Sequence, residues 1–254
     1  MKRSDSLHPV RSAALSRGAS GRRLALGVCA LLVAWGLLGA MGLAHGAEPA
    51  APPFGPGEKL TFEIRWGPVR AGTAELATLA FQTVDGVRAY HFTLTARTNA
   101  YLDRIYRVRN RIDAFADAGL NQSLRYLKKQ HEGFYKRNIL VDFDWVRMEA
   151  QYSDAGKKRD PISIQPGTFD ILSAFHAMRL TDWERAEEVQ RPVTDGKKAF
   201  VGKARFIRRE TIQVPAGTFD TLLVEPDVAH LGGVFEKSPG ARIEIWLTAD
   251  RRQI

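Results

Sequence analysis

Apolar and polar residues alternate along 58–66. Leu60, Phe62, Ile64 and Trp66 occupy every second position, and the residues between them are charged or polar. A period of two is typical of a β-strand that packs one face and exposes the other to water. The same pattern recurs along most of the chain, so the sequence predicts a mainly β protein, built as a curved antiparallel sheet or an incomplete β-barrel.

Turn signals divide the pattern into successive strands. Asp85-Gly86 is a hairpin signal because both residues tolerate a positive φ. Small residues near Gly72 suit a place where the sheet bends or another backbone comes close. A bend is expected near Arg208-Arg209. Further strands are expected at 69–82, 88–98, 106–113, 120–130, 133–143, 145–152, 197–214, 219–228 and 241–247.

The periodicity changes once, at 168–183, where apolar residues recur every three or four positions and predict one main amphipathic helix. Thr168 is expected to cap its start, with Asp170 favourable in the first turn. Residues 181–191 are interpreted as a charged continuation or a loop. The apolar positions of the helix are Phe169, Leu172, Phe175 and Met178.

The N-terminal segment has the features of an export signal. Arg22 and Arg23 precede an uncharged apolar run at 24–44 that ends in small residues. Residues 1–47 are therefore predicted to be a cleavable signal peptide, and the protein to be periplasmic. An inner-membrane anchor is the alternative, because 21 apolar residues suffice to span a bilayer. Residues 48–56 are expected to be a disordered linker.

Charge and cysteine content narrow the function classes. The formal net charge of +9 falls to +4 beyond residue 47, where 31 Lys and Arg face 27 Asp and Glu. No nucleic-acid partner is therefore expected. Cys29, the single cysteine, lies within the predicted leader, so the exported chain would have neither a disulfide nor a thiolate metal site.

Four segments form a recognisable set, namely Gly57–Phe62 with Gly72, Phe169–Arg179, Val214–Phe219 and Ile245–Asp250. Together they resemble a family of exported bacterial proteins, DUF3108. The resemblance implies a β-rich cell-envelope domain over 57–254, with no assigned activity and no catalytic residues to transfer. Because such proteins continue through further strands, the ending at 251–254, which reads as mid-strand, is expected to be a truncated C-terminal end.

No motif of a hydrolase, phosphate loop, dinucleotide site or zinc site is present, so neither an enzyme activity nor a cofactor is predicted. The histidines at 91, 131, 176 and 230 lack metal-ligand spacing. A polar or hydrogen-bonded position on the helix is expected for His176. Asp142 and Asp144 share a strand face, which leaves a polymer hydrolase as a remote alternative to a solvated face.

Arg107, Arg109 and Arg111 share one strand face and repel one another unless anions lie opposite. One interpretation is a surface that binds lipid headgroups or another acidic polymer. The other is cross-strand pairing with Asp or Glu on a neighbouring strand.

Aromatic residues on the predicted strands and helix raise a second hypothesis. An incomplete barrel with a helix across its mouth can hold an acyl chain, whereas the same side chains can also fill a solid core. The candidate ligand-binding residues are Phe62, Trp66, Phe92, Tyr106, Phe143 and Phe175.

We therefore expect a non-catalytic envelope protein that binds an apolar or anionic envelope component such as lipid. The alternative is a structural or assembly partner of another envelope protein, bound through a sheet edge or the arginine face.

Overall fold

A computed structural model of the chain describes residues 52–227 and 242–254. The predicted leader at 1–47 lies outside these ranges. Within them, the protein is mainly β with one α-helix, as the alternation predicts. None of the helices in the two ranges combines the length and apolar character needed to cross a membrane.

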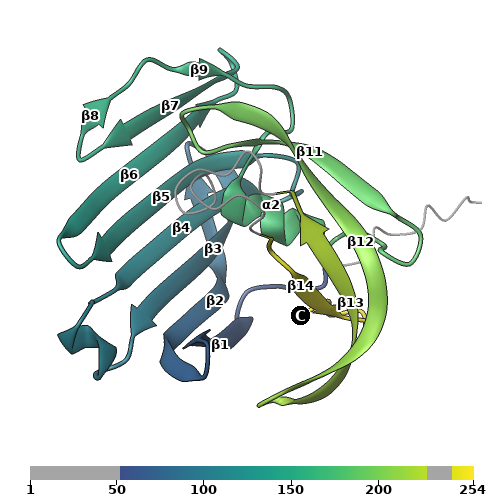
Figure 1. Ribbon diagram of the computed structural model, residues 1–254. Coiled ribbons are helices and arrows are strands. Elements are labelled where there is room, and N and C mark those ends of the chain that lie inside the picture. The colour runs from purple at the N-terminus through teal and green to yellow at the C-terminus, as the bar shows by residue number, and fades with distance from the viewer. Residues whose placement is uncertain (1–51, 228–241) are drawn as a thin grey trace, which may run out of the picture. The chain divides into compact units, whose positions relative to one another are not determined.

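The first sheet follows the order of the sequence, with every neighbouring pair of strands antiparallel (Figure 1). A short strand, β9 (Ile162–Ser163), also pairs with β7, and a 3₁₀ turn, η1 (Leu102–Arg104), lies between β3 and β4. The strands are β1 (Lys59–Trp66), β2 (Val69–Val84), β3 (Val87–Thr98), β4 (Arg109–Asp117), β5 (Ser123–Glu132), β6 (Tyr135–Asp144), β7 (Glu149–Asp154) and β8 (Lys157–Lys158).

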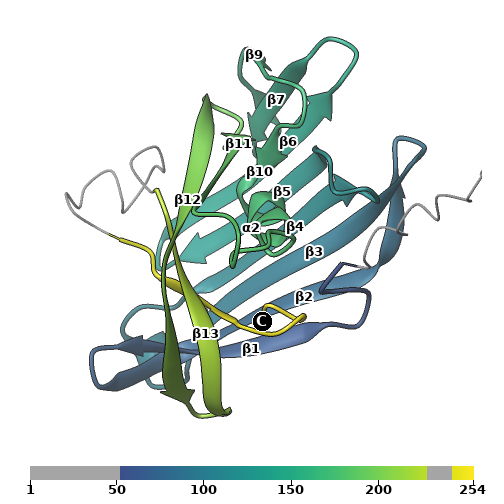
Figure 2. The same cartoon turned by 90° about the vertical axis from the view of Figure 1, so that its right-hand side faces the viewer.

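The second sheet has five strands in the order β10 to β14. It begins with a parallel pair, β10 and β11, and continues with antiparallel pairs. The helix α2 (Ile171–Met178) follows β10 directly and lies between the two sheets in both views (Figures 1 and 2). The strands are β10 (Phe169–Asp170), β11 (Glu188–Thr194), β12 (Ala199–Val214), β13 (Gly217–Pro226) and β14 (Ile245–Thr248).

Two local signals act as the sequence predicts. Asp85 and Gly86 form the β2–β3 turn with φ of 49° and 82°. A Cβ atom at Gly72 would lie 2.0 Å from the carbonyl oxygen of Arg97, so the backbones of β2 and β3 meet where only glycine fits. The register of β12 shifts between Phe206 and Arg208, close to the expected bend.

The helix is shorter than predicted, and Asp170 rather than Thr168 caps it. The Asp170 carboxylate accepts hydrogen bonds from the backbone N–H groups of Leu172 and Ser173, each at 2.9 Å. The preceding residues are extended because they pair with β11. The strand β11 itself was not predicted, because Arg191 lies on the same face as Val189 and Val193 and breaks the alternation.

The C-terminal residues differ from the predicted strand. β14 covers only Ile245–Thr248, and residues 249–252 form a turn rather than the middle of a strand. The Asp250 carboxylate accepts hydrogen bonds from the Thr248 hydroxyl at 2.8 Å and the Arg252 N–H at 2.9 Å. The Thr248 N–H then donates to the Ile254 carbonyl at 2.9 Å, which returns the chain alongside β14.

The main core lies where α2 packs against the first sheet, in contact with β3 and β4. Phe92 and Phe169 are completely buried there, together with Leu172 and Ala177 of the region around the helix. A second cluster surrounds Trp183 beneath β13 and β14. Side chains of α2 therefore fill the concave side of the first sheet over its middle strands.

Candidate functional site

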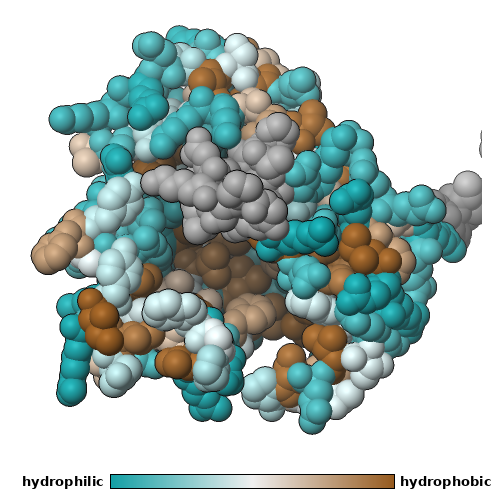
Figure 3. Space-filling view, viewed as in Figure 1, coloured by the Kyte–Doolittle hydropathy of each residue, from teal (hydrophilic) through white to brown (hydrophobic). Residues whose placement is uncertain are grey.

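A large cavity lies between the two sheets, beside α2. Its volume is about 1800 Å³, and most of its lining is apolar. Figure 3 shows it as a hollow with brown, hydrophobic side chains at its base and hydrophilic ones around it. Pockets for small molecules are typically roughly 300–1,000 Å³, so this cavity is larger than most of them need.

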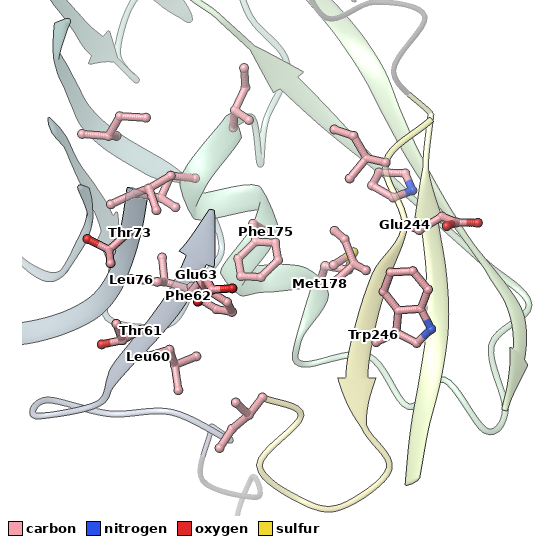
Figure 4. Close-up of a pocket in the computed structure, with 18 of the residues that line it drawn as sticks. Leu60, Thr61, Phe62, Glu63, Thr73, Leu76, Phe175, Met178, Glu244 and Trp246 are labelled. Carbon is pink, nitrogen blue, oxygen red and sulfur yellow. The ribbon is translucent and has the colours of Figure 1, made fainter. Parts of the chain in front are cut away.

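One wall of the cavity is formed by β1, β2 and α2. Leu60 and Phe62 of β1 and Leu76 of β2 face Phe175 and Met178 of the helix (Figure 4). The spacing of three between Phe175 and Met178 places both on the side of α2 that faces the cavity.

The opposite wall belongs to the second sheet. Val189 and Val193 of β11, Phe200 of β12 and Trp246 of β14 line it. Figure 4 shows the Trp246 ring across the cavity from Phe175. The indole N–H of Trp246 donates to the carboxylate of Glu210 at 2.8 Å, so the polar edge of this ring is satisfied.

Leu60 and Phe62 of β1 line this cavity, which corrects the prediction of a packed face. Leu60 and Ile64 are only partly buried, Phe62 is 46% exposed and Trp66 is 78% exposed. The reason is tertiary, because the helix covers the middle strands and leaves β1 without a packed layer opposite.

The structure separates the six predicted ligand-binding aromatics. Phe62 and Phe175 line the cavity. Phe92 and Phe143 instead belong to the packed core, beneath the helix and the short strands that follow β7. Trp66 and Tyr106 are exposed and do not line the cavity. Two of the six predicted aromatics therefore line the cavity, and its other lining residues include aromatics that were not predicted, such as Phe200 and Trp246, together with aliphatic side chains.

Arg191 is a cation in the apolar wall, and the sequence analysis missed it. It lies between Val189 and Val193 on the same face of β11 and lines the cavity. Gly202 is its cross-strand neighbour, which leaves room for the long side chain. Its Nε is buried without a hydrogen-bond partner, and within 52–227 and 242–254 no acidic group pairs with it. The centre of the Phe169 ring lies 5.8 Å from its guanidinium carbon.

The three predicted anion-binding arginines have different surroundings. Arg109 pairs with Asp103 of η1, which lowers the pKa of that carboxyl to about 2 mainly through hydrogen bonding. Arg111 pairs with Asp113 of its own strand at 2.7 and 2.8 Å. The acids thus come from the turn and from β4, not from a neighbouring strand. Arg107 is exposed and makes no ion pair within the described parts of the chain.

Arg179, at the end of α2, contacts both ends of the described chain, and sequence reasoning missed this buried group. Arg179, whose side chain is 1% exposed, donates to both Glu58 carboxylate oxygens at 2.8 Å. It also donates to the carbonyl oxygens of Arg252 at 3.0 Å and Gln253 at 2.8 Å. Glu58 and Arg179 both lie in segments that carried the family resemblance, and this resemblance was the one feature of the sequence that could have pointed to them.

His176 is buried in the core, which corrects the expectation of a polar position. Its ring stacks on Phe92 with the centroids 3.7 Å apart and meets Phe54 edge-on at 5.0 Å. Neither ring nitrogen has a hydrogen-bond partner among the residues that the structure describes. Burial, together with the positive charge of Arg179, lowers the pKa of His176 well below its ordinary value.

Asp170 is also buried, beside the start of α2. Ser123 of β5 donates to its carboxylate at 2.6 Å, and its own backbone N–H donates to the Ser123 oxygen at 2.8 Å. Burial raises the pKa of Asp170, although its hydrogen bonds act in the opposite direction. The pair ties the helix start to the first sheet.

Asp142 and Asp144, the remote hydrolase candidates, have separate surroundings. Asp142 pairs with Arg125 at 2.5 Å on the sheet. Asp144 accepts hydrogen bonds from the backbone N–H groups of Val146 and Arg147 at 3.0 and 2.9 Å, which fixes the β6–β7 turn. Neither carboxylate lines the cavity.

Within 52–227 and 242–254, no group of three His, Cys, Asp or Glu side chains is placed to hold a metal ion. His91 contacts Asp113 at 2.8 Å, and His176 lies in the core. His230 lies outside the described residues.

Comparison with known proteins gave a family and a distant structural match. The profile of a family described as "Protein of unknown function (DUF3108)" matches residues 61–254. No curated protein matches the sequence. A crystal structure of a beta-barrel-like protein of domain of unknown function DUF1849, from Brucella abortus, matches at 11% identity. That match covers 77% of this chain and 87% of that chain, with a TM-score of 0.47.

Proposed function

This chain belongs to DUF3108, a family of proteins of unknown function, and we propose that it binds a long-chain amphiphile, such as a lipid, in the cavity between its sheets. The observation that carries the proposal is the cavity itself, about 1800 Å³ in volume with mostly apolar walls. Apolar surface in contact with water costs about 25 cal/mol per Å², so an apolar occupant is favoured.

The size of the cavity supports an extended chain rather than a compact metabolite. Each buried methylene contributes about 0.8 kcal/mol to binding. The apolar residues on the facing walls, from Phe62 and Phe175 to Trp246, offer contact along the length of such a chain. Aromatic rings and the flexible side chain of Met178 adapt to different chain lengths.

Arg191 supports an acidic headgroup. The Arg191 side chain is partly buried in an apolar wall, and its buried Nε–H has no hydrogen-bond partner among the described residues, which is unfavourable. A carboxylate or phosphate of the ligand would supply the missing anion and accept paired hydrogen bonds. The proposed ligand is therefore an anionic amphiphile, and the predicted export signal at 1–47 would deliver the protein to a compartment rich in such molecules.

Displacement of a fluorescent fatty acid tests the proposal. The purified protein is titrated with dansyl-labelled undecanoic acid, and palmitate and hexadecanol are then added as competitors. We expect saturable binding of the probe and displacement by both competitors. If the probe shows no saturable binding, the proposal is wrong.

Blocking the cavity gives the matched comparison. Ala174, on the helix, lines the cavity, whereas Val146 is almost fully exposed in the β6–β7 turn and does not. Ala174→Trp is expected to weaken probe binding at least tenfold, because the added ring occupies the space of the chain. Val146→Trp introduces the same ring outside and is expected to bind as the unmodified protein does. Equal affinities in the two variants would place binding outside the cavity.

The role of Arg191 is tested by comparing the binding of palmitate, which is charged, with that of hexadecanol, which is not. Hydrogen bonds to charged groups contribute about 1.5–3 kcal/mol, so Arg191→Met is expected to weaken palmitate binding roughly tenfold to a hundredfold. Hexadecanol binding should change little, and Arg191→Lys should retain part of the preference. If the variant and the unmodified protein bind both competitors alike, the headgroup assignment fails while the cavity proposal stands.

A further inference from the structure

We infer that the connections at one end of the first sheet form a docking surface for an anionic lipid bilayer. They are the β1–β2 hairpin, the β3–β4 connection that contains η1, and the β5–β6 hairpin. The loop-end surface means the exposed residues of 65–70, 99–108 and 133–137. This inference concerns a surface rather than the cavity, and it does not depend on what the cavity binds.

The strand order brings these three connections together. Because β1 to β6 are sequential antiparallel neighbours, every second connection emerges at the same end of the sheet. They gather on the left-hand side of Figure 2, whereas the β2–β3 hairpin lies at the right. The loops are therefore neighbours in space although they are far apart in sequence.

Large apolar side chains are exposed at every one of these loops. Trp66 is 78% exposed, Tyr101 67%, Ile105 72% and Tyr106 51%, and Phe134 is fully exposed. Single exposed apolar residues are common, but a concentration of aromatics at one end of a molecule indicates an interaction surface. At the opposite end of the sheet, the most exposed apolar side chains are those of the valines in the β2–β3 and β6–β7 turns.

Hydrogen bonds hold the loops together as one surface. Asn99 donates from its side chain to the Arg70 carbonyl at 2.6 Å and from its backbone to the Ala71 carbonyl at 3.0 Å. The Gly133 N–H donates to the Arg107 carbonyl at 2.8 Å. The Tyr106 ring lies so close to Gly133 that a Cβ there would be 2.9 Å from it. The aromatics are thus presented on a fixed scaffold.

The charge of the loop-end surface selects the partner. Arg104, Arg107 and Lys136 are exposed and make no ion pair within 52–227 and 242–254. Among the acids near these loops, Glu63 pairs with arginines of the β1–β2 hairpin, Asp103 pairs with a β4 arginine, and Glu132 accepts a hydrogen bond from the Asn110 side chain. Aromatic rings mixed with unpaired cations match the interface of an anionic bilayer, where rings insert at headgroup depth and cations meet lipid phosphates.

The loop-end surface is continuous with the cavity. Arg65 and Arg70 of the first hairpin and Asn99, Ala100 and Asp103 of the second connection also line the cavity. A protein docked through these loops would therefore hold one side of the cavity against the bilayer. This arrangement would let a lipid chain move between the two without crossing water.

Vesicle binding tests the surface. Sedimentation of the purified full chain with phosphatidylcholine vesicles, with and without phosphatidylglycerol, measures partition at low and high salt. Each cation near an anionic surface contributes about 1 kcal/mol, so Arg104→Gln with Arg107→Gln should weaken partition to anionic vesicles about thirtyfold at low salt. Trp66→Ser with Phe134→Ser should weaken it on both vesicle types. Val146→Ser is the matched control. Any contribution of the apolar residues 24–44 to vesicle partition is the same in all of these variants.

A position-specific probe identifies the end that meets the membrane. In a Cys29→Ser background, an environment-sensitive dye is attached through Tyr101→Cys or through Val146→Cys. A blue shift on anionic vesicles is expected at 101 only. Equal responses at the two positions, or vesicle partition unchanged by the loop variants, would overturn the inference. Vesicle binding that persists in Ala174→Trp, whose cavity is blocked, would show that the surface acts independently of the cavity.

Discussion

The first sheet is packed over its middle strands and open at β1. β3 and β1 both alternate apolar and polar residues, yet Phe92 of β3 is completely buried and Phe62 of β1 is 46% exposed. α2 lies against β3 and β4, while β1 faces the second sheet across a cavity of about 1800 Å³.

The difference shows that one sequence pattern serves two purposes in one sheet. Where the helix supplies a second layer, alternation builds a core and contributes stability. Where the second layer stands apart, the same alternation presents apolar side chains to a cavity, and in the proposed function the strand contributes to ligand binding instead. We therefore expect substitutions in the packed region to change the free energy of unfolding and those at the open strand to change ligand affinity.

Truncation of one phenylalanine in each region gives the largest expected contrast. Phe92→Ala should lower the free energy of unfolding by about 3–5 kcal/mol, because it removes a fully buried ring and leaves a cavity. Phe62→Ala should cost under about 1 kcal/mol and should weaken binding of the fluorescent fatty acid. Urea unfolding curves measure the first effect. Comparable losses of stability in the two variants would contradict the contrast.

The ion pair between Glu58, next to β1, and Arg179, at the end of α2, is expected to have the next largest effect on the free energy of unfolding. Arg179→Met leaves the Glu58 carboxylate and two backbone carbonyls without their partner, which should cost about 3 kcal/mol. Adding Glu58→Leu to the same protein should restore part of the loss, because no buried charge then remains. A double variant less stable than the single one would contradict the idea that the unpaired Glu58 carboxylate causes the loss.

Gly72, where β2 and β3 lie closest together, allows a test of backbone packing rather than of a side-chain contact. Gly72→Ala should cost about 1–3 kcal/mol, since the new methyl group meets the Arg97 carbonyl oxygen. Gly55→Ala is the matched control, because a Cβ there has no neighbour within 4 Å. Thermal unfolding of both variants measures the effect, and equal midpoints would contradict the close approach of the strands.

The smallest expected effect is a pH dependence from His176. Its pKa in the folded protein lies well below the ordinary value of 6.5, so above that pH the imidazole is neutral in both states. As the pH falls below 6.5, the unfolded chain takes up a proton that the folded protein excludes. Stability should then decrease by up to about 1.4 kcal/mol per pH unit until the folded pKa is reached.

His176→Phe should remove this dependence while preserving the stacked ring on Phe92. Asp170 contributes with the opposite sign, because its pKa is raised on folding, but it is present in both proteins. The difference between the two stability–pH curves therefore isolates the histidine. Parallel curves from pH 7 to pH 5 would show that the imidazole is solvated or charged in the folded state.

Local signals in the sequence predicted much of the fold and little of the site. The Asp85-Gly86 hairpin, the alternation of β3 and the helical spacing around Phe175 each act within a few residues. The strand β11 escaped prediction because its partners, β10 and β12, are what make it extended. Arg191 escaped with it, since a single arginine in a charged segment has no pattern of its own.

The amino-acid sequence determined which residues are extended, where the chain turns and which side chains share a face, because φ and ψ preferences and a period of two are local properties. Only the tertiary structure decided which apolar faces are covered. α2 packs on the middle of the first sheet and the second sheet stands away from β1, so Phe92 lies in a core and Phe62 borders a cavity. The burial of a strand face depends on which element packs against it, and that element comes from a distant part of the chain.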